Sequence, residues 1–454
     1  MTSRPAIALA LRLSALAVLI LGPNPLPAQF DANLGRIVGE VLGPDGQGIP
    51  RAGVVVISDG SGSRREAASD TAGRFRVGSL RPGIYSVTAS SADFASSTVE
   101  NVAVRVGSTV RIDVRLDIEQ TYTEIEVAAG MIDALLPASS NVVRDRVFND
   151  LPINGRRFHD FALLTPGVQI SRAAGHLSFG AQRGIYTNVS VDGTDYNQAF
   201  FGGIQGGERA GAAMTLPQSA IQEFQAVTSG FTAEYGRTTS GVVNVSTKSG
   251  GNELHGDAFF QVRHPRLGLA DPFGAKVLED LRQFGGSAGG AAKRNVAFWF
   301  FAIERQSSTS PRYVEFPLLD IADRSRGAEA FDYFASLEEP FEATNDAIAL
   351  TPRFDYQHPG GSQFMVRYNY SSGQGANAVS IGNPKHPRTT EAVSNNGTEE
   401  NSIHFLTAQL TSVFAPNVLN QFRFTVTREQ RPRWANSERP GVFTAIGDFG
   451  PRGF

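Results

Sequence analysis

The feature that most constrains this fold is a strict alternation of apolar and polar side chains after Gly250. The alternation covers residues 254–263, where only Phe259 breaks it, and also residues 363–370 and 421–427. Because side chains of a β-strand point to opposite faces in turn, each segment is a predicted strand with one aromatic face and one polar face. Such strands are typical of a transmembrane barrel. A soluble sandwich alternates as well, so the residues upstream have to decide between the two.

Those upstream residues contain a compact unit of short strands. Within Leu216 to Gly250 the sequence predicts strands at residues 220–227 and 242–247, because apolar and β-branched residues gather there. Gly230, Gly236 and Gly241 separate the predicted strands and permit tight turns.

Five motifs of this region resemble the plug domain of TonB-dependent outer-membrane transporters, in particular the Oar-like subgroup. They are LPINGRRFHDFALLTPGV (residues 151–168), NVSVDGTDYN (188–197), IQEF (221–224), AEYGR (233–237) and GVVNVSTKSG (241–250). The resemblance implies a plug domain over residues 130–250, with residues 202–211 as a glycine-rich plug loop. It also implies a set of framework residues that do not contact ligand: Asp192, Gly193, Glu223, Glu234, Tyr235, Gly236 and Gly241.

The first 28 residues are a predicted signal peptide. Arg4 precedes an apolar run, and Leu26-Pro27-Ala28 offers a cleavage site. The alternative is a membrane anchor, which Arg12 inside a short apolar run disfavours. The chain is therefore predicted to be exported.

Residues 29–119 are a predicted small β-sandwich. Short strands alternate with Pro-Asp-Gly and Pro-Gly turns. The motifs GRIVGEVLGPDGQGIPRAGVVV and DTAGRFRVGSLRPGIYSVTA resemble a carboxypeptidase-regulatory-like domain. We expect a structural or interaction module, with sugar or protein binding as the alternative.

Residues 120–129 form a predicted linker that resembles the Ton box, the segment that the TonB complex of the inner membrane engages. An extended segment of this kind can add to a sheet edge of a partner. The alternative is the last strand of the sandwich or the first of the plug. The candidate contact residues are Thr123, Glu124, Ile125, Glu126, Val127, Ala128 and Ala129.

Residues 251–454 are the predicted N-terminal part of a barrel in contact with outer-membrane lipid. The aromatic cluster at residues 298–301 suits a girdle at the membrane interface, and residues 305–347 and 371–401 are predicted external loops. Transporter barrels have about 22 strands, whereas this segment is long enough for about seven or eight. The chain is therefore expected to be the front part of a longer protein. The fold class is mainly β: a small sandwich, an α+β plug and the first strands of an incomplete transmembrane β-barrel.

The sequence predicts no enzyme, metal site or cofactor. Ser287 lies in a G-x-S-x-G pattern but lacks the strand–turn–helix frame of a nucleophile elbow, and no H-E-x-x-H motif occurs. A net charge of −3 disfavours nucleic acid as a partner. The expected function is TonB-dependent uptake of an unidentified substrate at the cell outer membrane. The alternative is a secreted or surface-attached sandwich that binds glycan or protein without transport.

Overall fold

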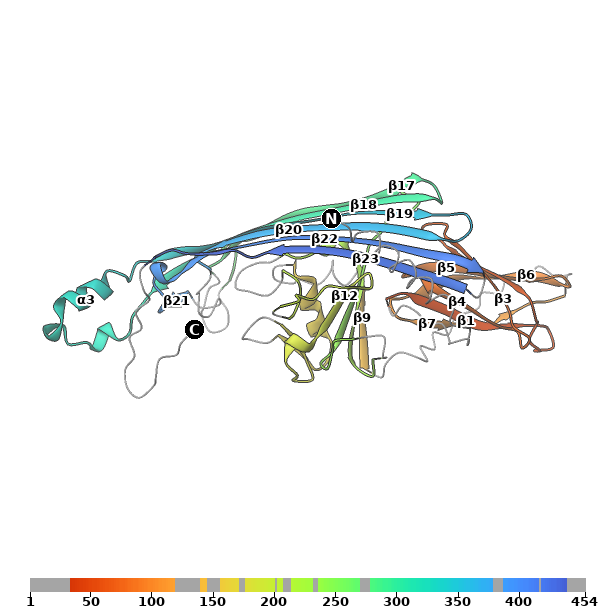
Figure 1. The fold of residues 1–454 in the computed structure, drawn as a ribbon, viewed down its shortest axis with the longest axis horizontal. Coiled ribbons are helices and arrows are strands. Elements are labelled where there is room, and N and C mark those ends of the chain that lie inside the picture. The colour runs from red at the N-terminus through yellow and green to blue at the C-terminus, as the bar shows by residue number, and fades with distance from the viewer. Residues whose placement is uncertain are drawn as a thin grey trace, which may run out of the picture.

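The computed structural model describes residues 33–118, 139–144, 156–170, 176–200, 202–206, 214–231, 236–269, 278–378, 387–415 and 418–438. Three units follow one another along the chain, and we call them the sandwich, the plug and the wall (Figure 1). No helix in these ranges is long and apolar enough to cross a membrane.

The sandwich consists of two small sheets around an apolar core. One sheet has the order β4-β1-β7, with β8 also on β1, and the other has the order β3-β2-β5-β6. Alternate residues of each strand point inward, as in the burial pattern of β1, and form one cluster that includes Ile37, Val54 and Val87. The strands are β1 (Gly35–Leu42), β2 (Gly53–Ser58), β3 (Arg64–Ala68), β4 (Arg74–Leu80), β5 (Gly83–Ser91), β6 (Phe94–Val104), β7 (Thr109–Arg111) and β8 (Val114–Arg115).

The plug is a mixed five-stranded sheet with short 3₁₀ helices packed on it. Its strand order is β13-β12-β15-β14-β9, with β12 parallel to β15 and β9 at one edge. The strands predicted at residues 220–227 and 242–247 are β14 and β15. The elements are β9 (Ser139–Arg144), η2 (Phe158–Leu164), β10 (Val168–Ile170), β11 (Leu177–Phe179), η3 (Gly184–Tyr186), β12 (Asn188–Val191), β13 (Thr194–Asp195), η4 (Gln218–Ala220), β14 (Ile221–Ser229) and β15 (Val242–Thr247).

The wall is an open antiparallel sheet of long strands, each paired with its neighbour in the sequence. Two short strands, β21 (Arg388–Thr389) and β24 (Arg433–Ala435), pair with β18 and β22. The connection from β18 to β19 carries η5 (Leu319–Ile321), η6 (Arg324–Arg326) and α3 (Ala328–Ala335), and η7 (Val393–Asn395) precedes β22. The long strands are β16 (His255–Arg263), β17 (Asp280–Lys293), β18 (Ala297–Val314), β19 (Phe341–Gln357), β20 (Gln363–Ala376), β22 (Gly397–Ala415) and β23 (Val418–Gln430).

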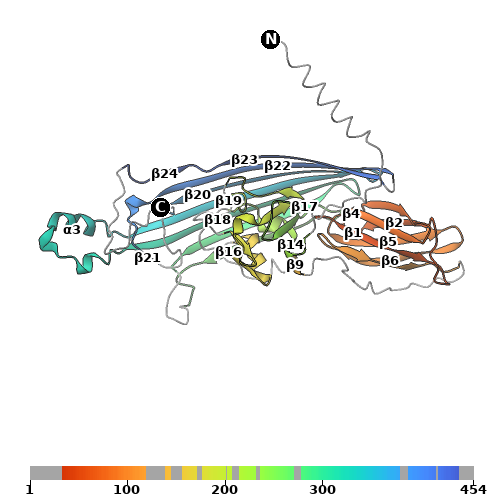
Figure 2. The ribbon, with the colours of Figure 1, turned by 60° about the horizontal axis from the view of Figure 1, so that its bottom comes forward.

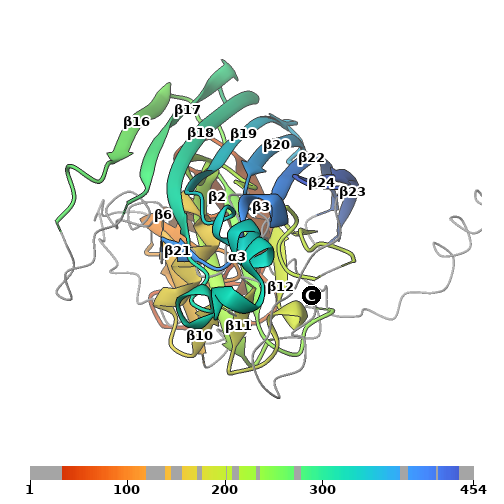
Figure 3. The same ribbon diagram turned by 90° about the vertical axis from the view of Figure 1, so that its left-hand side faces the viewer.

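The wall curves around the plug, which lies on its concave side (Figure 3). The sandwich sits beside the plug at one end of the wall, and α3 marks the other end (Figures 1 and 2). Short turns join β17 to β18 and β19 to β20 at the sandwich end. The longer connections, which include α3, lie at the far end.

Alternation along the wall strands separates an outward apolar face from an inward polar one, as the sequence predicts. On β20, Met365, Arg367 and Asn369 are buried toward the plug, whereas Phe364 is 37% exposed on the outer face. The outward apolar positions on β19 run from Ile348 to Tyr356. Eight steps from residue to residue, at about 3.3 Å each, span about 26 Å along the strand, and a tilt of about 40° reduces this to about 20 Å of height. That height is close to the apolar band of an outer-membrane barrel, about 25 Å.

The predicted external loops are partly wrong, because the strands continue through them. Residues 305–314 belong to β18 and residues 341–347 to β19, while residues 371–376 and 397–401 belong to β20 and β22. Polar side chains dominate these extensions, which suggested loops. The pairing continues nevertheless, because main-chain hydrogen bonds of the ladder do not depend on side-chain polarity.

The expected aromatic girdle at residues 298–301 is also only half right. Phe298 and Phe300 are buried on the inner face, where Phe300 packs against Ala220 of the plug. Only Trp299 and Phe301 point outward, at 37% and 39% exposure. Four consecutive aromatic residues of one strand cannot share a face, since successive side chains alternate.

Candidate functional site

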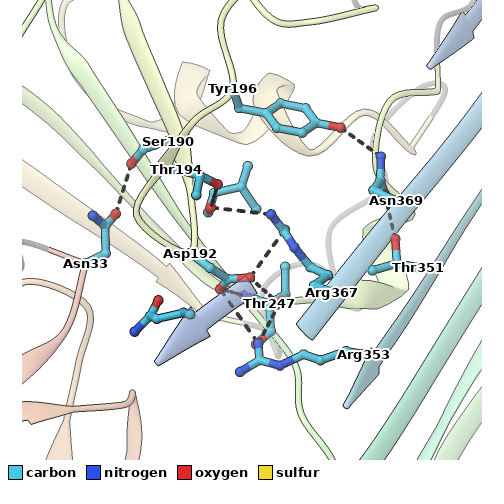
Figure 4. Close-up of polar contacts among 12 residues, drawn as sticks. Asn33, Ser190, Asp192, Thr194, Tyr196, Thr247, Thr351, Arg353, Arg367 and Asn369 are labelled. Atoms are coloured by element: carbon cyan, nitrogen blue, oxygen red, sulfur yellow. Dashed lines mark hydrogen bonds and ion pairs between the residues drawn. The ribbon is translucent and has the colours of Figure 1, made fainter. Parts of the chain in front are cut away.

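The candidate site is the contact between the plug and the inner face of the wall, and it begins at the turn between β12 and β13. Asp192 and Gly193 occupy this turn with φ of 48° and 74°. Two successive positive φ values define a type I′ hairpin turn, which Asp-Gly favours because both residues tolerate the left-handed region. The sequence therefore builds a tight turn whose carboxylate lies between Thr247 of the plug and two arginines of the wall (Figure 4).

Asp192 is bound from both sides. The backbone N–H of Thr247 donates to its Oδ1 at 2.9 Å, and the Thr247 hydroxyl donates to its Oδ2 at 2.7 Å. From the wall, Arg367 Nη1 lies 3.3 Å from Oδ2 and Arg353 Nη1 lies 3.7 Å from Oδ1. One plug carboxylate thus joins β15 of the plug to β19 and β20 of the wall.

These arginines also reach plug backbone. Arg353 Nη1 donates to the carbonyl oxygen of Thr247 at 2.9 Å, and Arg367 Nη2 donates to that of Val191 at 3.4 Å. At the same turn, Arg423 Nη1 of β23 donates to the carbonyl oxygen of Gly193 at 2.5 Å. Three wall strands, β19, β20 and β23, therefore contact the hairpin that β12 and β13 form in the plug.

The charge of Asp192 is stabilised in this setting. Burial by itself raises the pKa of a carboxyl group, but Arg367, Arg353 and the two hydrogen bonds from Thr247 outweigh it. The pKa of Asp192 is accordingly held below its ordinary value. Asp192 is ionised at neutral pH, and its pairing with the wall persists there.

A neutral network lies beside the charged one. The Asn369 side-chain N–H donates to the Tyr196 hydroxyl and to the Thr215 carbonyl oxygen, both at 2.8 Å, while the Thr351 hydroxyl donates to Asn369 Oδ1 at 2.7 Å (Figure 4). The Tyr196 ring packs on Phe405 with centroids 4.8 Å apart. Phe405 belongs to the wall yet shares the apolar core of the plug, together with Ile403.

A second ion pair ties the plug to β18. Arg156 contacts Glu304 with both Nε and Nη2, at 3.3 Å and 3.1 Å, and the Ser219 backbone N–H donates to the same carboxylate at 2.7 Å. The Arg156 guanidinium also stacks 3.7 Å from the ring centroid of Phe259. This contact explains why Phe259 interrupts the alternation in β16: its ring faces the plug and not the outer surface.

The other predicted framework residues occupy several places in the plug. The Gly241 backbone passes under the ring of Phe179, where an added Cβ would lie 2.4 Å from a ring carbon. The Gly236 carbonyl oxygen accepts a hydrogen bond from the Asn188 side chain at 2.6 Å. The Glu223 carboxylate accepts from the backbone N–H of Val106, which belongs to the sandwich. The signal peptide, the candidate Ton box at residues 123–129, and Glu234 and Tyr235 lie outside the described residues.

His159 is a titratable group inside the plug that the motifs did not single out. Its side chain is buried, and Nε2 lies 3.5 Å from Asp160. Burial, with a smaller effect from Arg157, lowers the pKa of His159 to about 3. The imidazole is therefore neutral at physiological pH.

Two further kinds of site, a metal site and a nucleophile elbow, are not assembled in the part of the chain that the structure describes. Within the ranges given above, no three His, Asp or Glu side chains gather as a metal site. Ser287 lies in the middle of β17, between β16 and β18, and donates to Asp257. A nucleophile elbow requires a strand–turn–helix junction, and this serine is not at one.

The wall partners of Asp192 are the residues that sequence reasoning did not find. The alternation placed Arg367 on the polar face, but a face includes many polar residues, and periodicity does not say which of them meets a given plug residue. The sequence did contain one signal of these partners. Both arginines lie on strands that also carry aromatic residues, and an isolated buried charge needs a partner.

Comparisons with known proteins agree with this architecture. Residues 36–117 match the family model of the carboxypeptidase regulatory-like domain, and residues 246–325 match that of an outer membrane beta barrel domain. The TonB-dependent transporter Oar of Myxococcus xanthus is 26% identical over 295 residues, which cover 60% of this chain and 26% of Oar. The chain thus spans about a quarter of the length of this relative.

Solved structures with a related arrangement include the siderophore receptor PirA from Acinetobacter baumannii. It has 15% identity and a TM-score of 0.43 over 65% of this chain and 40% of that chain. The outer membrane transporter YddB from Escherichia coli has 11% identity and a TM-score of 0.45 over 64% of this chain and 38% of that chain.

The resemblance seen in the motifs is confirmed by the matches to Oar and to the two domain families. This chain is similar to the TonB-dependent transporter Oar, and it combines a match to the carboxypeptidase regulatory-like domain at residues 36–117 with a match to an outer membrane beta barrel domain at residues 246–325.

Proposed function

We propose that this chain belongs to a TonB-dependent receptor that takes up a substrate, still unidentified, across the outer membrane. The observation that carries the proposal is the position of the plug: it rests on the polar inner face of a sheet whose outer face is apolar and aromatic. The similarity to Oar supports the same function. Substrate binds above the plug, on the side of the long connections, and passes when the plug is displaced or remodelled.

The bonds between plug and wall suit a part that has to move. Asp192, Asn369 and Glu304 hold the plug through hydrogen bonds and ion pairs, which water can replace. The net contribution of one hydrogen bond is about 0.5–1.5 kcal/mol between neutral groups and about 1.5–3 kcal/mol where one group is charged. Among the described residues, the wall adds Ile403 and Phe405 to the apolar core of the plug, and smaller apolar clusters join Ala220 to Phe300 and Met214 to Ala347. Polar contacts that water can replace one at a time thus accompany a limited apolar contact.

The TonB complex acts, in this proposal, on residues 123–129, and the position of this segment sets the path of the force. The segment lies between β8 of the sandwich and β9 of the plug. Among the described strands, β9 lies at the edge of the plug sheet, where it pairs with β14. A force that pulls on the segment therefore acts on β9 first. β9 can then detach without breaking the pairing between β14 and β15.

A matched pair of variants tests the TonB contact. Proline has no backbone N–H, so Ile125→Pro with Val127→Pro prevents strand addition to a partner sheet, whereas threonine at both positions preserves it. We expect site-specific crosslinking between this segment and TonB to disappear in the proline variant and to persist in the threonine variant. Equal crosslinking in the two variants contradicts the contact.

Cell fractionation separates this function from that of a secreted binding module. A membrane-embedded wall keeps the protein in the outer-membrane pellet after carbonate extraction. Release of the protein into the carbonate supernatant is the result expected of a surface-attached module without transport, and it would overturn the proposal.

A further inference from the structure

The sandwich touches the plug and the wall at the same time. The Gln222 side-chain N–H of the plug donates to the Pro82 carbonyl oxygen at 2.9 Å. On the wall side, Gln363 donates to the hydroxyl of Ser63 at 2.8 Å. The sandwich is therefore docked against both units, and its connection between β4 and β5, which includes Pro82, lies at the junction of all three.

Arg81 extends from that connection to the wall. Its Nη2 lies 2.6 Å from Oδ1 of Asp355, a β19 residue whose side chain is 2% exposed. Arg353 holds the same carboxylate with two hydrogen bonds, at 2.9 Å and 3.2 Å. Arg353 in turn contacts Thr247 and Asp192 of the plug.

These contacts form an unbroken line of alternating charges through all three units. Its order is Arg81 in the sandwich, Asp355 and Arg353 in the wall, Asp192 in the plug, and Arg367 in the wall. Each charge has an opposite charge next to it. In a setting this buried, the attraction between neighbouring charges is weakly screened, so a change at one end alters the contacts at the other.

We propose that the docked sandwich is a latch that helps to hold the plug against the wall. Arg81 is the positioning residue through which the sandwich acts on Asp355 and Arg353. With Arg81 present, Asp355 is shared between two cations, and Arg353 remains free to bind Thr247 and Asp192. Without Arg81, Asp355 has one cation only, so it draws Arg353 away from the plug. Undocking of the sandwich therefore weakens the contacts of Arg353 that hold the plug inside the wall.

The test measures the mobility of the plug and not transport, so it can fail while the proposed uptake function stands. Hydrogen exchange is followed in the full chain for peptides covering Ile221–Ser229 and Val242–Thr247. We expect Arg81→Ala to speed this exchange by about tenfold or more, since it unpairs one side of a buried carboxylate. Arg81→Lys keeps one charged contact and restores part of the protection. Arg74→Ala, which removes an exposed pair with Asp70 inside the sandwich, is the matched control and leaves plug exchange unchanged.

A double-mutant cycle separates the latch from simple damage to the sandwich. If Arg81 acts through Asp355, then Arg81→Ala adds little to the exchange rate of an Asp355→Asn variant. Two results overturn the proposal: unchanged plug exchange in Arg81→Ala, or a full effect of Arg81→Ala in the Asp355→Asn background. The second result would mean that the loss of Arg81 acts by disturbing the sandwich itself.

Discussion

At the scale of single residues, Asp192 is the point where plug and wall are bonded most densely. It receives two hydrogen bonds from Thr247 and faces two arginines. Asp195, only three residues away, forms an ion pair with Arg237 in which both side chains are largely exposed. The two aspartates allow a comparison of a buried and an exposed pair within one hairpin.

We predict that Asp192→Asn weakens the plug by about 3–5 kcal/mol, because it removes the acidic partner of the buried Arg367 and one of the two acidic partners of Arg353. Asp195→Asn should cost at most about 1 kcal/mol, as exposed pairs do. The chain has no native cysteine, so one cysteine placed at the buried Ala226 reports opening of the plug through its rate of reaction with a maleimide. Equal rates in the two variants would argue against the central role of Asp192.

His159 gives the plug a dependence on pH. Its pKa is lowered to about 3 in the folded state, whereas the unfolded state has the ordinary value of about 6.5. Between these values the unfolded state binds more protons, so stability falls as pH falls below about 6.5, by about 1.4 kcal/mol per pH unit. Asp192 has a lowered pKa and loses its contribution only below its ordinary value, in a more acidic range.

The pH prediction is checked by urea unfolding of the plug between about pH 7.5 and about pH 4.5. The Ala226→Cys probe can be read with a thiol reagent that works in acid. His159→Gln should remove most of the loss between about pH 6.5 and about pH 4.5, since glutamine does not titrate. Asp160, whose pKa burial raises, is present in both proteins, so the difference between them reports the histidine. A His159→Gln protein with the wild-type pH dependence would exclude this explanation.

Sequence reasoning reached some residues of the site and not others, for a physical reason. Asp192 and Gly193 were found because a tight turn depends on local backbone preferences. Arg353 and Arg367 were not identified as their partners, because contacts between residues more than a hundred positions apart depend on how plug and wall pack together. Phe259 illustrates both cases. The sequence showed that this residue breaks the alternation, but it did not show that the cause is the contact with Arg156.

At the scale of elements, the strands were predicted well and their lengths were not. The alternation identified β16, β20 and β23, and the glycine-separated runs identified β14 and β15. The far ends of the wall strands were assigned to loops, because their polar residues carry no periodic signal. Those ends extend beyond the apolar band, where water satisfies an outward polar side chain and the ladder continues.

The plug sheet should open in a definite order. β9 has one neighbour, β14, whereas β15 lies between β12 and β14. We predict that amides of Ser139–Arg144 exchange with solvent faster than those of Val242–Thr247 in the resting protein, since an edge strand can leave without disrupting the rest of the sheet. Hydrogen exchange resolved by peptide provides the measurement. Faster exchange in β15 than in β9 would contradict the force path proposed above.

At the scale of the whole molecule, the sandwich and the plug have separate cores, and polar contacts make up most of the bonds among the three units. The sandwich core and the plug core are distinct clusters, and the wall adds its inner face to the second of them. The succession of sandwich, plug and wall followed from motifs in the sequence. Their docking did not, because Arg81 belongs to a motif that identifies only the sandwich, and Asp355 belongs to a strand without a recognisable motif.

The central claim is that the wall faces lipid with its aromatic side and the plug with its polar side. Single cysteines at Phe364, Val366 and Phe424 on the outer face, and at Met365 and Thr407 on the inner face, can each carry a fluorescent label in outer membranes. Lipids with a nitroxide in their acyl chains should quench the three outer labels strongly and the two inner labels weakly. Quenching of the inner labels, or of none, would contradict the account.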